Sequence, residues 1–212
     1  MTTQYNGTLI TFEGPEGSGK TTQIQQLAEF MEEEGKQVIT TREPGGTGIG
    51  CSIRDILLDP SFPHIQKRTE LLLFLSDRAQ HVQEIIIPAL ESGKTVLCDR
   101  FIDSTVAYQV GGRLFPEELI NTLNDFSAYS VVPDITFMLD VEYEIGIKRA
   151  TRVFTDRFEQ ETQSFHKKIR AKYHDLAKKN SDRMIVIDTS QKSIDEIQKV
   201  LRKMVVEKKI VR

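Results

Sequence analysis

The sequence predicts an α/β protein built around a parallel β-sheet. Five short apolar segments, each of four or five residues and rich in Val, Ile, Thr and Phe, recur along the 212 residues. Longer stretches of helix-forming residues separate them, and this alternation is typical of parallel strands joined by right-handed helical crossovers. The apolar segments do not alternate with polar residues, which predicts strands that are buried on both faces.

The expected elements follow in chain order. We expect strands at 8–12, 37–41, 95–98, 135–139 and 184–187. A helix should fill 21–35, since Gly35 is suited to end it, and a longer one should fill 68–93, which ends at Gly93. No internal repeat and no linker rich in Gly, Pro or Ser divides the sequence, so we expect one domain over residues 1–212.

Composition excludes several classes of protein. The net charge of −3 gives no basic excess of the kind that nonspecific nucleic-acid binders carry. The two cysteines, Cys51 and Cys98, lie far apart, which favours a reduced compartment over a disulfide framework. The sequence has no signal-peptide pattern, no apolar run of the roughly 18 residues that span a bilayer, and no histidines in metal-ligand spacing. We therefore expect a soluble cytoplasmic protein without nucleic-acid or membrane partners and without a protein-held zinc.

A glycine-rich motif joins the first strand to the first helix. Residues 14–21 read GPEGSGKT, which fits the P-loop pattern G-x-x-x-x-G-K-[ST]. Glycines let backbone N–H groups approach phosphate oxygens, and the helix N-terminus adds its positive dipole end. Lys20 should reach the β- and γ-phosphates, and Thr21 should hold Mg²⁺. The predicted ATP-binding residues are Gly14, Pro15, Glu16, Gly17, Ser18, Gly19, Lys20, Thr21 and Thr22. A glycine-rich turn without a ligand is the alternative.

Charged residues also follow the second and third strands, at the sheet edge where open α/β proteins bind ligands. Arg42 ends the second strand, and Asp99 and Arg100 follow the third. Either arginine can grip a phosphate through two parallel hydrogen bonds. Asp99 is placed like the Mg²⁺-orienting acid of a P-loop enzyme, although a helix N-cap would explain it as well.

Two further segments could bind a nucleoside. Phe74 and Arg78 stand four residues apart on one helix face, where they could stack on a base and bond its edge. A core Phe beside a surface Arg is the alternative. The segment after Asp99 adds three polar or aromatic candidates: Thr105, Tyr108 and Gln109.

A basic stretch lies between two helical patterns at about 148–157. It contains Lys148, Arg149, Arg152 and Arg157. Such a run usually forms a solvated face, but in a P-loop enzyme it indicates a lid that closes over phosphates.

The sequence resembles the thymidylate kinases, of the P-loop nucleoside monophosphate kinases. The resemblance covers nearly the whole chain and rests on FEGPEGSGKTT, TREPGGT, LLLFLSDRAQH, DRFIDSTVAYQ, PDITFMLDV and DRFEQE. These motifs imply a three-layer P-loop kinase fold, with helices flanking a five-stranded parallel sheet in the order 2-3-1-4-5, usually in a homodimer. They also imply transfer of the ATP γ-phosphoryl group, with Mg²⁺, to dTMP, which gives dTDP for dTTP synthesis.

The resemblance assigns roles to single residues. Arg42 and Arg100 would hold the dTMP phosphate, Phe74 would stack on thymine, and Arg78 would bond its O4. The remaining residues expected near the base are Thr105 and Gln109.

The resemblance also assigns residues to the sugar of the acceptor and to the lid. Tyr108 would lie near the 2′ position, and Glu16 would face the 3′-hydroxyl. An acidic pair expected near the same sugar is Asp156 and Glu159. The P-loop holds no basic residue between its glycines, which implies the bacterial arrangement with a catalytic arginine from the lid. The predicted catalytic residues are Lys20, Arg100, Arg149 and Arg152. This lid is shorter than the family pattern, so the choice between Arg149 and Arg152 stays open.

Two alternatives to dTMP kinase belong to different classes. A kinase of another nucleotide or of a deoxynucleoside keeps the P-loop, but a nucleoside acceptor needs a general base and has no use for Arg42 and Arg100 as phosphate clamps. A nucleotide-binding regulator without catalysis predicts damage to Lys20, Thr21 or Asp99, and all three are present.

Overall fold

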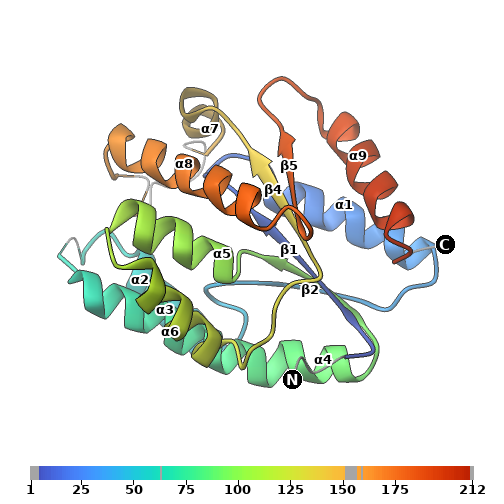
Figure 1. Ribbon diagram of the computed structural model, residues 1–212, viewed down its shortest axis with the longest axis horizontal. Coiled ribbons are helices and arrows are strands. Elements are labelled where there is room, and N and C mark those ends of the chain that lie inside the picture. Colours follow the sequence, from blue (N-terminus) through green and yellow to red (C-terminus); the bar gives the residue numbers. More distant parts are fainter. Residues whose placement is uncertain (1–4, 63, 151–156, 159, 211–212) are drawn as a thin grey trace.

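The computed structural model describes residues 5–62, 64–150, 157–158 and 160–210. Five parallel strands form one sheet in the order β2-β3-β1-β4-β5. Helices cover the sheet on both sides (Figure 1). The predicted fold class, including its strand order, is confirmed.

All five predicted strands are present. Their bounds are β1 (Thr8–Glu13), β2 (Val38–Arg42), β3 (Thr95–Asp99), β4 (Ile135–Asp140) and β5 (Met184–Asp188). Each strand ends one residue later than its apolar run, and each added residue is charged. The backbone of these residues still pairs with a neighbour, as where Arg42 lies opposite Asp99. Five charged residues therefore stand at the carboxyl edge of the sheet.

The prediction of burial on both faces is right for the inner strands and wrong for the edges. β1 and β4 are almost wholly buried, and β3 is buried up to Asp99. The edge strands β2 and β5 leave residues such as Thr40 and Val186 exposed. An edge strand has only one neighbour and lies at the margin of the helical layers, so its side chains are less covered.

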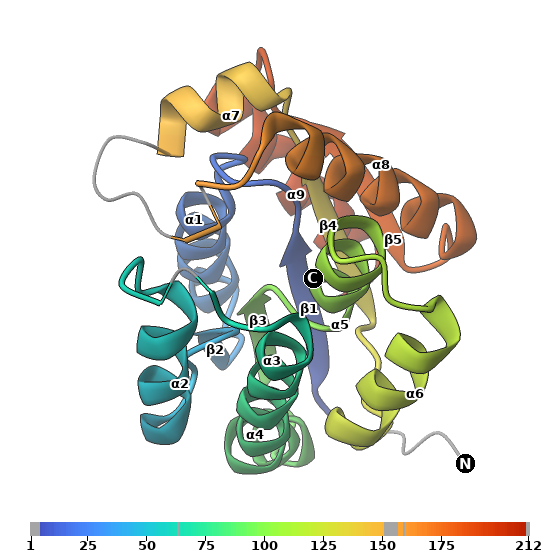
Figure 2. The ribbon, with the colours of Figure 1, turned by 90° about the vertical axis from the view of Figure 1, so that its left-hand side faces the viewer.

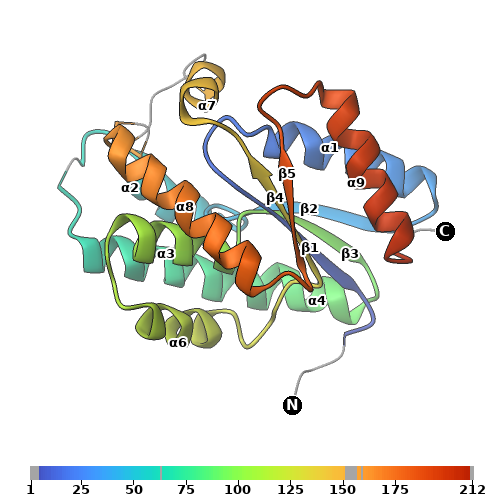
Figure 3. The ribbon, with the colours of Figure 1, turned by 45° about the horizontal axis from the view of Figure 1, so that its top comes forward.

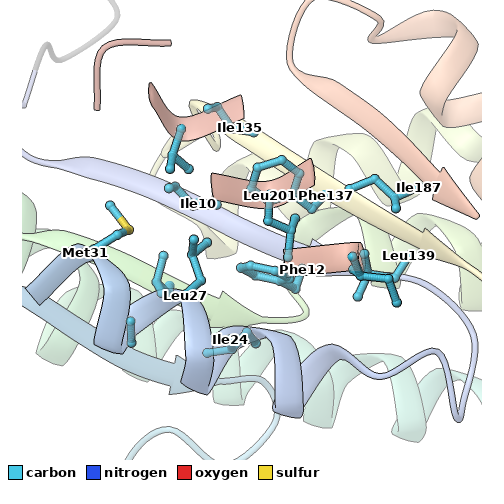
Figure 4. Close-up of a cluster of buried hydrophobic side chains, with 14 residues drawn as sticks. Ile10, Phe12, Ile24, Leu27, Met31, Ile135, Phe137, Leu139, Ile187 and Leu201 are labelled. Atoms are coloured by element: carbon cyan, nitrogen blue, oxygen red, sulfur yellow. The ribbon is translucent and has the colours of Figure 1, made fainter. Parts of the chain in front are cut away.

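One face of the sheet is covered by α1 (Lys20–Glu33) and α9 (Ile194–Glu207), which lie side by side in Figures 1 and 3. Their apolar stripes meet the inner strands in one cluster (Figure 4). Leu27 and Leu201 are fully buried there. Gly35, at φ +79°, follows the end of α1 as predicted. This packing fixes the start of α1 against the end of β1.

The other face carries more helices. They are α2 (Gly48–Leu58), α3 (Lys67–His81), α4 (Ile87–Glu91), α5 (Ile102–Thr105), α6 (Glu117–Ser127) and α8 (Gln163–Lys179), with two wider π-helical stretches, η1 (Val82–Ile86) and η2 (Val106–Gly112). The predicted helix 68–93 is a continuous helical run of α3, η1 and α4 that stops before Gly93 at φ +75°. In the described part of the chain, no helix combines the length and apolarity needed to cross a membrane.

Candidate functional site

A cavity of about 630 Å³ opens at the carboxyl edge of the sheet. The predicted residues that line it are Glu16, Gly17, Gly19, Lys20, Thr21, Thr22, Arg42, Phe74, Arg78, Asp99, Arg100, Thr105, Tyr108 and Gln109. Gly14, Pro15, Ser18 and Arg149 do not line it. Arg152, Asp156 and Glu159 lie outside the described residues. One cavity thus brings together most of the residues expected at two different nucleotides.

The P-loop needs glycine at three positions. Gly14, Gly17 and Gly19 have φ of +134°, +70° and +94°, in the left-handed region that favours glycine. A Cβ on Gly17 would overlap the carbonyl of Gly146, on α7 (Tyr143–Ala150). Figure 2 shows α7 beside the loop that leads into α1. The P-loop therefore lies directly against the backbone of the helix that precedes the expected lid.

α1 begins at Lys20 with no side-chain cap, and its residues Lys20, Thr21 and Thr22 line the cavity. Its unpaired first N–H groups are therefore suited to bind an anion there. The Lys20 ammonium donates to the carbonyls of Gly14 at 3.2 Å and Pro15 at 3.0 Å. Burial and then the charge of Arg100 lower the pKa of Lys20, against the opposing effect of Glu16. The cation is thus held inside the loop that is expected to bind phosphates.

Two oxygen ligands for a metal ion meet at the end of this loop. The hydroxyl of Thr21 donates to Asp99 Oδ2 at 2.9 Å. Asp99 does not cap the following helix, whose N-cap is Phe101, so the N-cap alternative is wrong. Among the described residues no group of three or more His, Cys, Asp or Glu could hold a metal. One carboxylate and one hydroxyl beside a phosphate site fit Mg²⁺, which is usually held by few protein oxygens and by substrate phosphates.

Arg100 is the centre of a hydrogen-bond network between the P-loop and η2. Its backbone has φ +71°, unusual for a residue with a side chain. Its guanidinium pairs with Glu16 at 2.5 Å and donates to the Gly14 carbonyl at 3.1 Å. The Tyr108 hydroxyl donates to the same Glu16 oxygen at 3.1 Å. Burial raises the pKa of Glu16, but Arg100 and Lys20 outweigh it and lower that pKa to about 2. Glu16 is therefore ionised at neutral pH.

Glu13, the carboxylate that supports Arg100 through two hydroxyl groups, was not among the predicted site residues. Glu13 is fully buried and accepts from the backbone N–H of Phe101 at 2.8 Å and from the Tyr173 hydroxyl at 3.0 Å. It also accepts from the Ser104 hydroxyl at 2.5 Å. Arg100 Nη1 donates to those two hydroxyls, each at 3.2 Å. The available signal was a charged residue at the end of an apolar strand, directly before Gly14.

Arg78 is buried, with 2% of its surface exposed. Its guanidinium pairs with Glu43 at 2.8 Å, and Nη1 donates to Thr105 at 2.8 Å and to Asn124 at 2.7 Å. The alternative of a surface arginine is therefore wrong. Phe74 is half-buried at the cavity wall, with its ring 5.9 Å from that of Phe158. Sequence reasoning missed Glu43 and Asn124, because neither lies at helical spacing from Arg78.

The described basic residues of the stretch 148–157 differ in their burial. Lys148 and Arg149 are exposed on α7, and Arg149 donates to the carbonyls of Thr189 at 3.1 Å and Ser190 at 3.2 Å. Arg157, expected in a solvated face or a lid over phosphates, is 8% exposed instead. The solvated face is therefore wrong for Arg157, whose guanidinium pairs with the carboxylate of Glu70 at 2.7 Å. The lid stays a prediction.

Known proteins share the sequence and the fold. The sequence profile of the thymidylate kinase family matches residues 12–201. A thymidylate kinase from Pelobacter propionicus is 46% identical over 202 residues, which cover 92% of this chain and 92% of that protein. One from Maridesulfovibrio salexigens is 46% identical over 208 residues, with coverages of 94% and 95%. The crystal structure of thymidylate kinase from Ehrlichia chaffeensis superposes with a TM-score of 0.79 at 37% identity, over 94% of this chain and 98% of that one.

The profile spans most of the chain, and the relatives align over nearly their full length. The P-loop and the cavity beside it lie within the matched range. On this evidence the chain belongs to the thymidylate kinase family.

Proposed function

We propose that this chain transfers the γ-phosphoryl group of ATP to dTMP and releases dTDP and ADP. The observation that carries the proposal is a cavity of about 630 Å³ that is lined by the P-loop, by two cationic side chains, Arg42 and Arg100, and by an aromatic one, Phe74. A donor on the P-loop and a monophosphate on the arginines would meet there. The family membership supports this reaction in particular.

The acceptor oxygen needs no strong general base. The second pKa of a phosphate monoester is about 6, so a monophosphate is largely dianionic at neutral pH. Glu16, a carboxylate that lines the cavity, has a pKa of about 2 and is a poor proton acceptor. This supports a phosphate acceptor over a nucleoside hydroxyl. We assign Glu16 to the sugar 3′-hydroxyl as an acceptor of a hydrogen bond.

The main task of the protein is to bring two anions together. Lys20 and the first N–H groups of α1 would hold the donor phosphates, and Arg42 and Arg100 would hold the acceptor phosphate. Arg152 of the lid would add the positive charge needed as the phosphoryl group moves. Such an arginine is worth roughly 10³–10⁵ in rate.

Thr21 and Asp99 would hold Mg²⁺, since their oxygens already lie 2.9 Å apart at the P-loop. The bound ion would neutralise charge on the phosphate oxygens. At the other end of the cavity, Phe74 would stack on the base and Arg78 would donate to its O4. Tyr108 would lie at the 2′ position, where its ring leaves no room for a ribose hydroxyl.

The remaining predicted residues would surround the base and the sugar. Thr105 and Gln109 would lie near the base, and Asp156 and Glu159 near the sugar. A cytoplasmic homodimer with only small-molecule substrates stays the prediction from the family resemblance.

A panel of acceptors tests the function. We would measure ADP formation from ATP and Mg²⁺ with dTMP, dUMP, UMP, dCMP, AMP, GMP and thymidine. Strong preference for dTMP, with weaker turnover of dUMP, is expected. Preference for another monophosphate would overturn the base-site assignment, and turnover of thymidine would overturn the argument that no base is needed. No turnover with any acceptor would favour a nucleotide-binding regulator.

A further inference from the structure

A buried carboxylate with no role so far lies beside the expected thymine pocket. Glu70, on α3, is 1% exposed. It accepts from Arg113 Nε at 3.0 Å and Nη2 at 2.9 Å, and it pairs with Arg157 at 2.7 Å. Arg113 also pairs with Glu161 at 2.5 Å. Two arginines and two glutamates thus form a charge-balanced cluster, which we call the Glu70 cluster.

Glu70 has one more partner, and it belongs to the cavity wall. The side-chain amide of Gln109 donates from Nε2 to Glu70 Oε1 at 3.1 Å. Burial raises the pKa of Glu70, but Arg113 and Arg157 outweigh it and hold that pKa below its usual range. An ionised carboxylate only accepts hydrogen bonds. It therefore requires the NH₂ end of the Gln109 amide and turns the oxygen the other way.

That oxygen is buried and has no hydrogen-bond partner in the part of the chain that the structure describes. Leaving such a buried group unpaired is destabilising, and most buried polar atoms have a partner. Gln109 is 1% exposed and contributes to the lining of the cavity. The oxygen requires a hydrogen-bond donor, which a molecule bound in the cavity can supply.

Arg78 supplies the opposite polarity nearby. Both Nη1 hydrogens are taken by Thr105 and Asn124, and Nε and Nη2 face Glu43. Among the described residues, these contacts leave one Nη2 hydrogen for a ligand. Thr105, which Arg78 contacts, lies about one helical turn before Gln109. The pocket wall can therefore offer one donor and one acceptor a short distance apart.

We infer that Glu70 sets the base specificity of the pocket by fixing the orientation of the Gln109 amide. This inference rests on the proposed dTMP kinase function. Thymine and uracil present a ring carbonyl next to a ring N–H, which match the Arg78 donor and the Gln109 acceptor. Cytosine presents an amino donor next to a ring-nitrogen acceptor, which is the reverse order. Without the charge of Glu70 the amide can rotate and offer its NH₂ end to the ring nitrogen of cytosine, which removes one of the two mismatches and leaves only the one at Arg78. Glu70 is a positioning residue, because it acts through Gln109.

The test compares discrimination between two acceptors. The ratio of kcat/KM for dTMP to kcat/KM for dCMP would be measured for the wild type and for Glu70→Gln. We expect the ratio to fall about tenfold or more, because the site that rejects cytosine depends on the fixed amide. The KM for ATP, which binds elsewhere in the cavity, should not change.

A matched set of variants separates this role from a structural one. Arg113→Gln disturbs the same cluster but leaves the contact between Glu70 and Gln109, so it should lower the melting temperature and keep the ratio. If Glu70→Gln does not fold, the double variant Glu70→Gln/Arg113→Gln removes one charge of each sign and keeps the cluster balanced. It should lose discrimination in the same way.

The outcomes are distinct. An unchanged ratio in folded variants that lack the Glu70 carboxylate overturns the inference and leaves the dTMP kinase function intact. An equal fall in Arg113→Gln also overturns it, because general loosening of the cluster would then explain the effect. Absence of dTMP turnover by the wild type would instead refute the proposed function.

Discussion

Arg149 is one of the two candidate catalytic arginines, and its described contacts lie away from the cavity. The guanidinium of Arg149 donates to two carbonyls in the loop after β5 and does not line the cavity. Because an arginine engaged there is not aimed at the phosphates, Arg152 is the better candidate for the transferred phosphoryl group. We expect Arg152→Ala to lower kcat by about a hundredfold or more, and Arg149→Ala to lower it less.

Steady-state kinetics with saturating ATP and dTMP would check this difference. Thr151→Ala, between the two arginines, is a control that changes the lid without removing a charge. Equal and small losses in both arginine variants would show that neither residue carries the catalytic charge.

Single charged residues were also where sequence reasoning was least complete. Asp99 and Arg42 could be placed from their positions at strand ends, because the carboxyl edge of a parallel sheet collects such residues. Glu13 stands at a strand end as well, but its role, like the roles of Glu43 and Glu70, comes from partners that are distant in sequence. Glu13, for example, contacts Tyr173, which is 160 residues away. A pattern along one chain contains no signal for such pairs.

At the scale of an element, one face of α3 lines the cavity and another is exposed to solvent. Phe74 and Arg78 face the cavity, whereas Leu72 on the same helix is 58% exposed. Stacking of an aromatic ring on a base is worth about 1–3 kcal/mol. Phe74→Ala should therefore raise KM for dTMP about tenfold and leave KM for ATP nearly unchanged.

Kinetics with each substrate varied in turn would measure both constants. Leu72→Ala serves as the matched control, since it shortens a side chain of the same helix outside the cavity. Loss of ATP affinity alone in Phe74→Ala would contradict the stacking role.

Strands and helices were predictable where the apolar residues of a segment all pack into the core. All five strands and the two long helical runs follow from their patterns. The π-helical widening at Val82–Ile86 and Val106–Gly112 was not visible, since it adds no change in composition. The second of these stretches carries Tyr108 and Gln109, so the directions of these two side chains could not be predicted from the sequence.

At the scale of the whole molecule, one buried acid should affect folding stability. Burial and the charge of Asp103 raise the pKa of Glu13 to about 7, against the opposing effects of Ser104, Arg100 and a backbone N–H. The folded state therefore binds a proton more tightly than the unfolded state, in which the pKa is near 4.5. The stability this provides is complete below about pH 4.5 and is lost as the pH rises through about 7.

Urea denaturation at several pH values between about 4.5 and 8 would measure the contribution of Glu13. We expect the free energy of unfolding to fall as the pH rises. Glu13→Gln cannot titrate and should give a flatter profile over that window. Glu16 gives the opposite pH dependence, because its pKa in the folded state is lowered to about 2. The stability that its ionised form contributes is present above about pH 4.5 and is lost as the pH falls below that value. Identical profiles for the wild type and Glu13→Gln would refute the assignment.

The contact between Gly17 and Gly146 limits how large parts of this molecule can move. Backbone lies directly on backbone there, because a Cβ on either residue would overlap the other segment. We therefore expect the P-loop and α7 to shift together, and α7 leads into the segment expected to form the lid. One displacement would then bring both the phosphate-binding loop and the start of that segment to a bound substrate, instead of two independent displacements.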